Sequence, residues 1–225
     1  MAITKVGASD ATFSGGATSL NRSRTATVIG NVIVIASTCG VRTNAATISD
    51  TQGNVWADCN PDQDDATLGV RVHSWYCHAK NTTATTITVA SNNSSGFMSM
   101  VLDEFTGTHL TAALDQHAEA PVGSTAADPV SPAITLGADN CVVWCRIGAN
   151  ANPAPALIDG TTGTQGADTG SNDETEYRVL TGRRGASVTA AWTMLSAGYT
   201  LFVASFKPPL LNPTGPFPTS RPDLP

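Results

Sequence analysis

The chain has 225 residues and a net charge of -6, and 41% of its residues are hydrophobic while 13% are charged. This composition is typical of a globular chain, since a disordered chain needs more charge and a helical bundle needs more Leu, Glu and Lys. The excess of acidic side chains, with only three lysines, argues against a surface that binds nucleic acid.

The N-terminal sequence, MAITKVGASDATFSGG, lacks a basic segment followed by an apolar run, so it does not predict a secretory signal. The longest apolar run, VIVIA at residues 32–36, has the length of a strand, whereas a membrane helix needs about 20 residues. We therefore expect a soluble protein that is made in the cytoplasm and has no membrane partner.

Strand signals follow one another along the chain, and no long segment has the 3.6-residue apolar period of a helix. Runs rich in β-branched residues alternate with turns rich in Gly, Asn, Asp, Ser and Pro. The pattern predicts an all-β fold, an antiparallel β-sandwich of jelly-roll-like form. The predicted strands are residues 25–29, 31–38, 69–79, 85–91, 97–105, 131–136, 140–148, 175–181, 186–194 and 199–206.

Two parts of the chain resemble each other weakly. Gly30-Asn31 precedes VIVIAS, and Asp139-Asn140 precedes CVVWCRIG. In both parts a polar insertion, an aromatic strand, a strand rich in Thr, Val and Ala, and an apolar strand ending in Phe come next. We expect one domain with two similar halves that interleave, followed by an extended arm. The expected domain covers residues 1–207, its halves cover about 25–107 and 131–207, and the arm covers 208–225.

The order of these motifs resembles a β-sandwich domain of tailed-phage virion structural and decoration proteins, which also occurs in some bacterial surface proteins. The motifs are GNVIVIAS, DTQGNVW, VHSWYCHAK, TTITVAS, MVLDEFTG, NCVVWCRIG, TEYRVL and LFVASFK. The resemblance covers about residues 3–207 and excludes the C-terminal arm. It implies a structural role in a capsid, tail, fibre or adhesin, and it brings no catalytic signature with it.

The number of cysteines is odd, and no C-x-x-C pair occurs. On one strand Cys141 and Cys145 would point to the same face about 13 Å apart, which is too far for a disulfide. We interpret the cysteines as buried, reduced thiols that pack as small apolar residues, with intermolecular or cross-strand disulfides as the alternative. The five are Cys39, Cys59, Cys77, Cys141 and Cys145.

The acidic segment DCNPDQDD begins like a calcium-binding loop, in which Asp58, Asp62 and Asp64 would supply ligands. However, Gln63 stands where an EF-hand needs Gly, and Gly69 stands where it needs Glu. We interpret the segment as a solvated turn between strands, with a loose calcium site as the alternative, and we expect no cofactor.

Aromatic and histidine side chains give two further signals. Trp56 follows a turn in DTQGNVW and could stack on a sugar, as in carbohydrate-binding modules, although such a tryptophan more often caps a core. His73 and Cys77 share one face of a predicted strand, but two ligands four residues apart are far from a zinc signature. No metal site is therefore expected.

No nucleophile, base and orienting group come together in a motif, so we do not expect an enzyme. Asp103 and Glu104 are adjacent on a predicted strand and should point to opposite faces, which does not suit a paired acid and base. Arg183 and Arg184 lie in TGRRGAS, which resembles a hairpin tip that could contact a partner.

The C-terminal arm contains seven of the 13 prolines. Proline lacks a backbone N–H and fixes φ, so we expect an extended, polyproline-like segment. Its apolar side chains are spaced so that each could fill a separate pocket. We hypothesise that the arm straps the protein to an adjacent virion subunit, with a loose end as the alternative. The expected anchors are Leu210, Leu211, Phe217 and Leu224.

The resemblance and the arm favour a bacteriophage virion structural protein, and above all a capsid decoration (cement) protein. Such a protein would bridge and stabilise neighbouring capsid subunits through many weak contacts. The alternatives are a tail or fibre module that binds host surface glycan, and a tail connector subunit. We expect the major capsid protein or other virion subunits as partners and a homo-oligomer, with a trimer favoured. We also expect assembly in the host cytoplasm and a final location in the virion.

Overall fold

The computed structural model describes residues 2–24, 28–40, 46–65, 69–92, 97–121, 123–149, 153–154, 156–168 and 173–209, without the side chains of 60–65 and 167–168. Within these ranges every regular element is a β-strand, and neighbouring strands pair antiparallel. The prediction of an all-β, antiparallel fold is thus confirmed.

The first half of the molecule, strands β1 to β9, forms one large sheet and one small sheet. The large sheet has the order β1-β9-β4-β7-β6, and β2 also pairs with β9. Its strands are β1 (Thr4–Lys5), β2 (Asp10–Gly15), β4 (Val32–Cys39), β6 (Trp56–Asp65), β7 (Val70–His78) and β9 (Phe97–Thr106). The small sheet has the order β3-β8-β5, with β3 (Ser19–Arg24), β5 (Ala46–Asp50) and β8 (Thr85–Ser91).

The second half, strands β10 to β20, has a large sheet of order β10-β20-β13-β17-β16, and β11 also pairs with β20. Its strands are β10 (Leu114–Glu119), β11 (Thr125–Ala126), β13 (Cys141–Ala149), β16 (Thr164–Asp168), β17 (Asp173–Leu180) and β20 (Ala197–Phe206). Two small sheets, β12-β18 and β15-β14-β19, accompany it. They consist of β12 (Ile134–Thr135), β14 (Leu157–Ile158), β15 (Thr161–Thr162), β18 (Ser187–Val188) and β19 (Ala190–Ala191).

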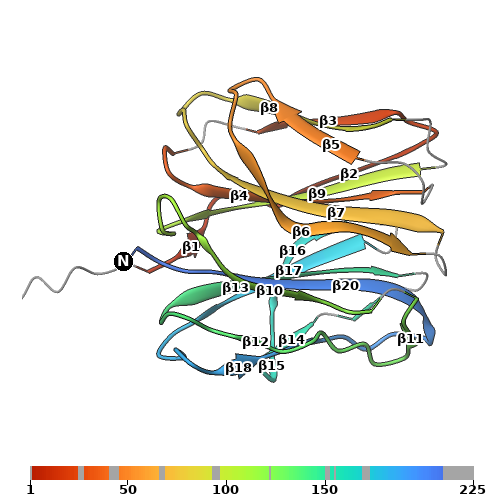
Figure 1. The fold of residues 1–225 in the computed structure, drawn as a ribbon, viewed down its shortest axis with the longest axis vertical. Helices are drawn as coiled ribbons and strands as arrows, with labels where there is room; N and C mark the ends of the chain where they lie inside the picture. The colour runs from red at the N-terminus through yellow and green to blue at the C-terminus, as the bar shows by residue number, and fades with distance from the viewer. Residues whose placement is uncertain are drawn as a thin grey trace, which may run out of the picture.

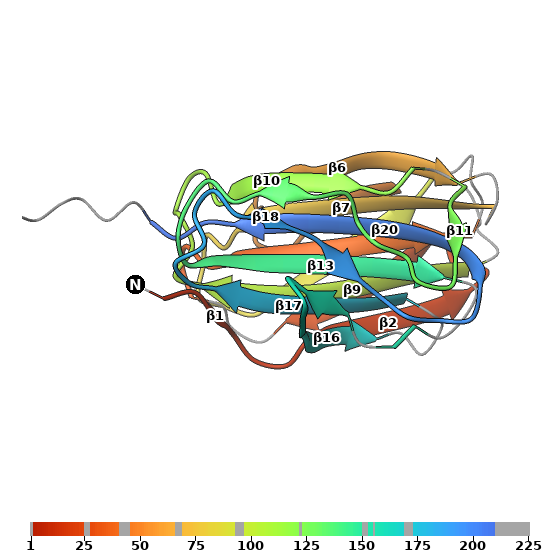
Figure 2. The same cartoon turned by 90° about the horizontal axis from the view of Figure 1, so that it is seen from below.

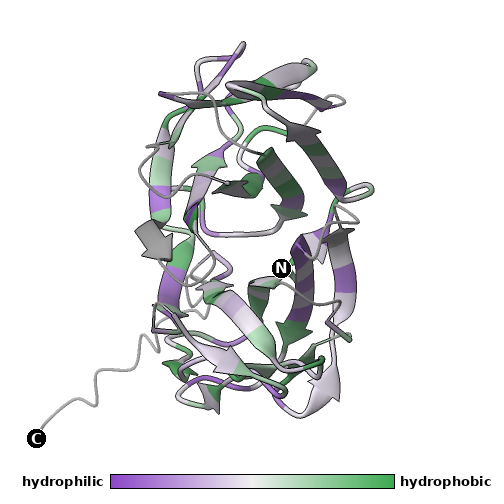
Figure 3. Cartoon of the chain, turned by 90° about the vertical axis from the view of Figure 1, so that its right-hand side faces the viewer, coloured by the Kyte–Doolittle hydropathy of each residue, from purple (hydrophilic) through white to green (hydrophobic). Residues whose placement is uncertain are grey.

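The sheets stack in four layers, small, large, large and small (Figures 1 and 2). The central strands have apolar residues on both faces because both faces are covered. On β4, Val32 and Val34 face the other large sheet, whereas Ile33 and Ile35 face the small sheet. The end view in Figure 3 shows the two stacked halves, with green hydrophobic segments along the strands of the inner layers.

The two large sheets place corresponding strands in the same order. In chain order, β4, β6, β7 and β9 of the first half occupy the positions that β13, β16, β17 and β20 occupy in the second half. Each ladder in the described part of the chain joins strands of the same half. The halves therefore stack face to face and do not interleave, in contrast to the arrangement expected from the sequence.

The acidic segment that the sequence indicated as a turn belongs to strand β6. This strand is the last in its sheet, and its pairing with β7 shifts register between Asp58 and Asn60 and again between Asn60 and Gln63. An edge strand with bulges accommodates a proline because one of its sides needs no ladder hydrogen bond. The sequence reasoning failed here because it took Pro61 and the run of acidic residues as turn signals.

Candidate functional site

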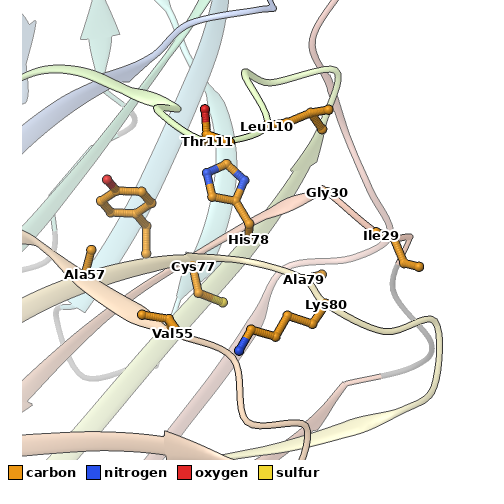
Figure 4. A pocket seen from close by; sticks show the side chains of 11 residues that line it. Ile29, Gly30, Val55, Ala57, Cys77, His78, Ala79, Lys80, Leu110 and Thr111 are labelled. Carbon is orange, nitrogen blue, oxygen red and sulfur yellow. The ribbon is translucent and has the colours of Figure 1, made fainter.

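An apolar pocket of about 580 Å³ opens at the end of the molecule where β7 ends and where β4 and β6 begin. Its walls are the turn before β4, the start of β6, the end of β7 and the loop that connects the two halves. In Figure 4, Leu110 and Thr111 of this loop lie above the end of β7. The volume lies within the usual range of binding clefts, about 300–1,000 Å³.

Gly30 shapes one wall of the apolar pocket. Its φ is 86°, a conformation that favours glycine, and its N–H donates to the carbonyl of Ala79 over 2.9 Å. A Cβ atom at this position would lie 2.7 Å from Cδ2 of Leu110. Glycine thus permits both the turn and the close approach of the connecting loop.

The rim of the apolar pocket consists of exposed aliphatic side chains. Ile29 is 64% exposed, Val55 is 71% exposed and Leu110 is 63% exposed, and the exposed Val28 precedes Ile29 in the chain. Aliphatic side chains that gather on a surface around a hollow are typical of a contact site for another molecule. The rim is therefore the part of the described surface that best fits a docking role.

His78 lies on the floor of the pocket, and its ring extends toward Thr111 in Figure 4. Both ring nitrogens are shielded from solvent, and neither makes a hydrogen bond of normal geometry with a described residue. Burial lowers the pKa of His78, an interaction with the Gly30 backbone opposes this shift, and His109 adds to it. The imidazole is therefore neutral at pH 7, which keeps the floor uncharged.

The last described segment of the chain is tied to the wall of the apolar pocket. The N–H of Lys207 donates to the carbonyl of Ala113, and the N–H of His109 donates to the carbonyl of Lys207, both over 2.8 Å. Pro208 and Pro209 then line a second hollow of about 270 Å³ on the second half, together with Arg184. The predicted anchors of the arm, Leu210, Leu211, Phe217 and Leu224, lie outside the described residues.

Trp56 lies next to the apolar pocket in the chain but does not line it. Its flanking residues Val55 and Ala57 contribute to the walls, because neighbouring side chains of a strand point to opposite faces. The Trp56 ring packs against the core of the first half, and its Nε1–H donates to Oδ2 of Asp50 over 2.7 Å. Stacking of Trp56 on a glycan stays a prediction.

Of the three predicted calcium ligands, only Asp58 has a described side chain, because Asp62 and Asp64 fall among the side chains left out. Oδ1 of Asp58 lies 2.8 Å from Nε2 of His73. The residues described here contain no group of three or more His, Cys, Asp or Glu side chains that could hold a metal ion. Because the side chains of Asp62 and Asp64 fall outside those residues, the calcium alternative stays a prediction.

Asp103 and Glu104 point to opposite faces of β9, as the sequence predicted. Asp103 faces the second half, where Nε1–H of Trp144 and Oγ1–H of Thr175 donate to its Oδ2 over 2.8 and 2.9 Å. Glu104 faces the other way and accepts hydrogen bonds from Arg24 Nε and Asn31 Nδ2 over 2.9 and 2.6 Å. Both carboxylates are thus engaged in internal contacts.

A second buried polar cluster joins the two large sheets. Nη2 of Arg146 on β13 lies 2.5 Å from Oδ1 of Asp173 on β17. Asp173 also accepts hydrogen bonds from Ser99 of β9 and from Thr38 of β4, and Arg146 donates to Thr38. These contacts cross from one half to the other, so the cluster helps to fix how the halves are stacked.

All five cysteines are buried, reduced thiols, as the sequence predicted. Burial raises the pKa of the Cys59 and Cys145 thiols well above the ordinary value, and it raises that of Cys141 to about 12. Cys141 and Cys145 both lie in the core of the second half, on the same face of β13. The thiols of Cys59, Cys141 and Cys145 are therefore protonated at neutral pH.

The two arginines of TGRRGAS have different surroundings. Nη1 of Arg183 lies 2.7 Å from Oδ2 of Asp159, so Arg183 is engaged within the chain. The backbone N–H of Arg184 donates to Oδ1 of Asp139, and Arg184 lines the hollow beside Pro208 and Pro209. Contact with a partner at this tip stays a prediction.

The sequence reasoning did not single out Ile29, Val55 or Leu110. They come from three turns far apart in the chain, and each looks like an ordinary apolar residue beside a strand. The nearest signal was DTQGNVW, which contains Val55 but drew attention to Trp56. Only the packing of the connecting loop over the end of β7 brings these side chains together.

The comparisons with known proteins identified no relative of this chain. In the described part of the chain no helix is long and apolar enough to cross a membrane. A scan against protein-family models found no match, and searches of curated proteins and of solved structures found no significant match.

Proposed function

We propose that this protein is a structural subunit of a tailed-phage virion, most specifically a capsid decoration protein that bridges and stabilises neighbouring capsid subunits. Residues 1–207 would form a β-sandwich domain of jelly-roll-like form, and the protein would act without catalysis. The sequence resemblance of residues 3–207 to phage virion β-sandwich domains supports this proposal. The buried carboxylates Asp103, Glu104 and Asp173 also support a role without catalysis, because each contacts groups within the protein.

The observation that carries the proposal is the apolar pocket with its exposed rim. A pocket rimmed by Ile29, Val55 and Leu110 exposes apolar surface that a partner subunit would remove from water. It lies at the end of a body with four stacked layers, whose buried core fixes the position of the rim. In a decorated capsid such contacts recur on many copies, so weak individual contacts add to a firm attachment.

Binding to undecorated heads tests the proposal. Purified full-length protein is incubated with empty heads of the phage that encodes it, and the heads are sedimented. We expect saturable binding in many copies per head, whereas a ring of about six to twelve copies would indicate a tail connector. No binding to heads, combined with binding to a host glycan array, would overturn the proposal in favour of the fibre alternative.

Two variants connect head binding to the apolar pocket. Val55→Asp and Leu110→Asp place a charge on the rim and should weaken head binding about tenfold or more, because a charge resists removal from water. Leu195→Asp is the matched control, since Leu195 is 81% exposed and is not among the residues that line the pocket. Equal losses in the rim variants and the control would show that the pocket plays no part.

A further inference from the structure

We propose that the apolar pocket holds the proline-rich segment 210–225 of a second copy of this chain, with Phe217 as the side chain that enters it. This inference rests on the proposed function, because it names the partner that the pocket contacts in the assembled particle.

The chemistry of the segment matches that of the pocket. Phe217 is flanked by Pro216 and Pro218, neither of which carries a backbone N–H. Burying Phe217 therefore leaves few donors without partners, which suits a pocket with aliphatic walls and a neutral His78 on its floor. Proline also restricts the free segment, so less conformational entropy is lost when it docks.

The course of the chain favours a neighbouring copy over the same copy. The carbonyl of Lys207 is held by His109, and Pro208 and Pro209 then run along the hollow beside Arg184 on the second half. The apolar pocket is formed by the first half and the connecting loop, whereas Pro208 and Pro209 lie against the second half. From Pro209 to Phe217 are eight residues, which in an extended conformation span about 25 Å, enough to reach another subunit.

An arm and a pocket on every copy make a head-to-tail contact. Such a contact closes into a ring when the rotation between neighbours allows it, and it leaves the same arm and pocket occupied on each subunit. This is how a homo-oligomer such as the expected trimer would form. The occupied pocket would then be buried only in the assembly.

Disulfide trapping between two differently tagged preparations tests the inference. One preparation carries Thr219→Cys, which leaves Phe217 in place, and the other carries Val55→Cys, both in the full-length protein. Cys77 lines the pocket, so both preparations also carry Cys77→Ala. The other native cysteines are buried, and burial raises the pKa of thiols such as Cys59 and Cys145. After mild oxidation of the mixture we expect a heterodimer on a non-reducing gel, because an arm held in the pocket would keep residue 219 beside the rim, where a disulfide can form.

The matched control replaces Val55→Cys by Leu195→Cys, which is equally accessible but lies outside the pocket lining. We expect at least about tenfold less heterodimer with this control. Similar yields would overturn the inference. So would ring closure within single molecules of the double variant Val55→Cys/Thr219→Cys at high dilution, because it would show that the pocket takes the arm of its own chain.

Sedimentation of the protein alone separates this inference from the proposed function. Phe217→Ser and Leu110→Asp should each shift the protein from oligomer to monomer, whereas Leu195→Asp should not. Head binding that depends on the pocket without any heterodimer would leave the proposed function standing and overturn the inference. A heterodimer without head binding would support the inference and overturn the proposed function.

Discussion

Arg146 and Asp173 form an ion pair that is shielded from solvent between the two large sheets. The pair has neutral partners from the first half, Thr38 and Ser99, so its charges are held by contacts from both sheets. Such a pair contributes little net stability compared with apolar residues, but removal of one member leaves an uncompensated charge. At the residue scale, this cluster helps to fix how the two halves are stacked.

We expect Arg146→Met to lower the free energy of unfolding by about 3–5 kcal/mol, because Asp173 would lose its counter-charge in a buried site. Urea denaturation measures the change. The control is Arg22→Met, since the pair of Arg22 with Asp10 is partly exposed, and its loss should cost no more than about 1 kcal/mol. Similar losses for both variants would contradict this account of the buried cluster.

Glu176 is a second buried carboxyl with an incomplete set of partners. Its Oε1 accepts a hydrogen bond from the N–H of Ala156 over 2.8 Å, while its Oε2 is buried without a hydrogen bond to a described residue. Burial raises the pKa of Glu176 to about 7, the Ala156 hydrogen bond opposes the shift, and Glu174 adds to it. The folded state therefore binds a proton that the unfolded state has already released above its ordinary pKa of 4.5.

It follows that the folded protein loses stability as the pH rises from about 4.5 to about 7, and the loss stays constant above this window. Glu176→Gln removes the cost of ionisation and keeps an acceptor for Ala156. We expect the variant to match the wild type near pH 4.5 and to be more stable at pH 8 by an amount on the order of 2 kcal/mol. Thermal melts at several pH values measure this, and a difference that does not vary with pH would refute it.

At the scale of elements, the two central strands differ from the edges. Every residue of β4 and β13 is buried, and each strand pairs on both sides. By contrast, β5 lies at the edge of a small sheet and alternates between exposed and half-buried residues. The central strands can lose their hydrogen bonds only if the layers separate, whereas an edge strand can open alone.

We therefore expect amide hydrogen exchange to be slowest in β4 and β13 and markedly faster in β5. Exchange followed by mass spectrometry of peptides measures this. The slowest amides of β4 and β13 should exchange with the free energy of global unfolding. Fast exchange in either central strand would mean that the layers come apart more easily than the structure indicates.

At the scale of the whole molecule, the two halves share one core. Apolar side chains of β4 and β9 pack against those of β13 and β20 between the large sheets, including Val34, Phe105, Trp144 and Phe202. Ring contacts also cross the interface, such as that between Phe105 and Tyr177 with centroids 5.4 Å apart. If the halves separated, each would expose the inner face of its large sheet to water.

We expect a single cooperative thermal transition in which the calorimetric and van't Hoff enthalpies agree, because neither half keeps its inner face covered without the other. Differential scanning calorimetry of the full-length protein measures both. Two resolved transitions would show that the halves fold as separate units.

The sequence indicated the apolar strands and missed the polar ones. The runs VIVIAST, CVVWCRIG and LFVASF predicted β4, β13 and β20. A strand that is covered on both faces is apolar along its length, so its sequence alone identifies it. The strands β2, β3, β5 and β10 are rich in polar residues and were not predicted. They adopt extended structure because each pairs with a strand that the sequence does predict, β8, β9 or β20, which is a tertiary effect.

The sequence by itself determined the all-β class, through β-branched runs between turns, and the burial of the cysteines, which pack as small apolar residues. It also determined the opposite orientation of Asp103 and Glu104, which follows from the two-residue period of a strand. Only the tertiary structure decided which strands pair, how the two halves stack, and that residues 29–30, 55, 57, 76–80 and 110–111 enclose one pocket. Neighbours in the sequence determine local periodicity. Contacts between distant segments depend on how the layers close over one another, and no local pattern records that.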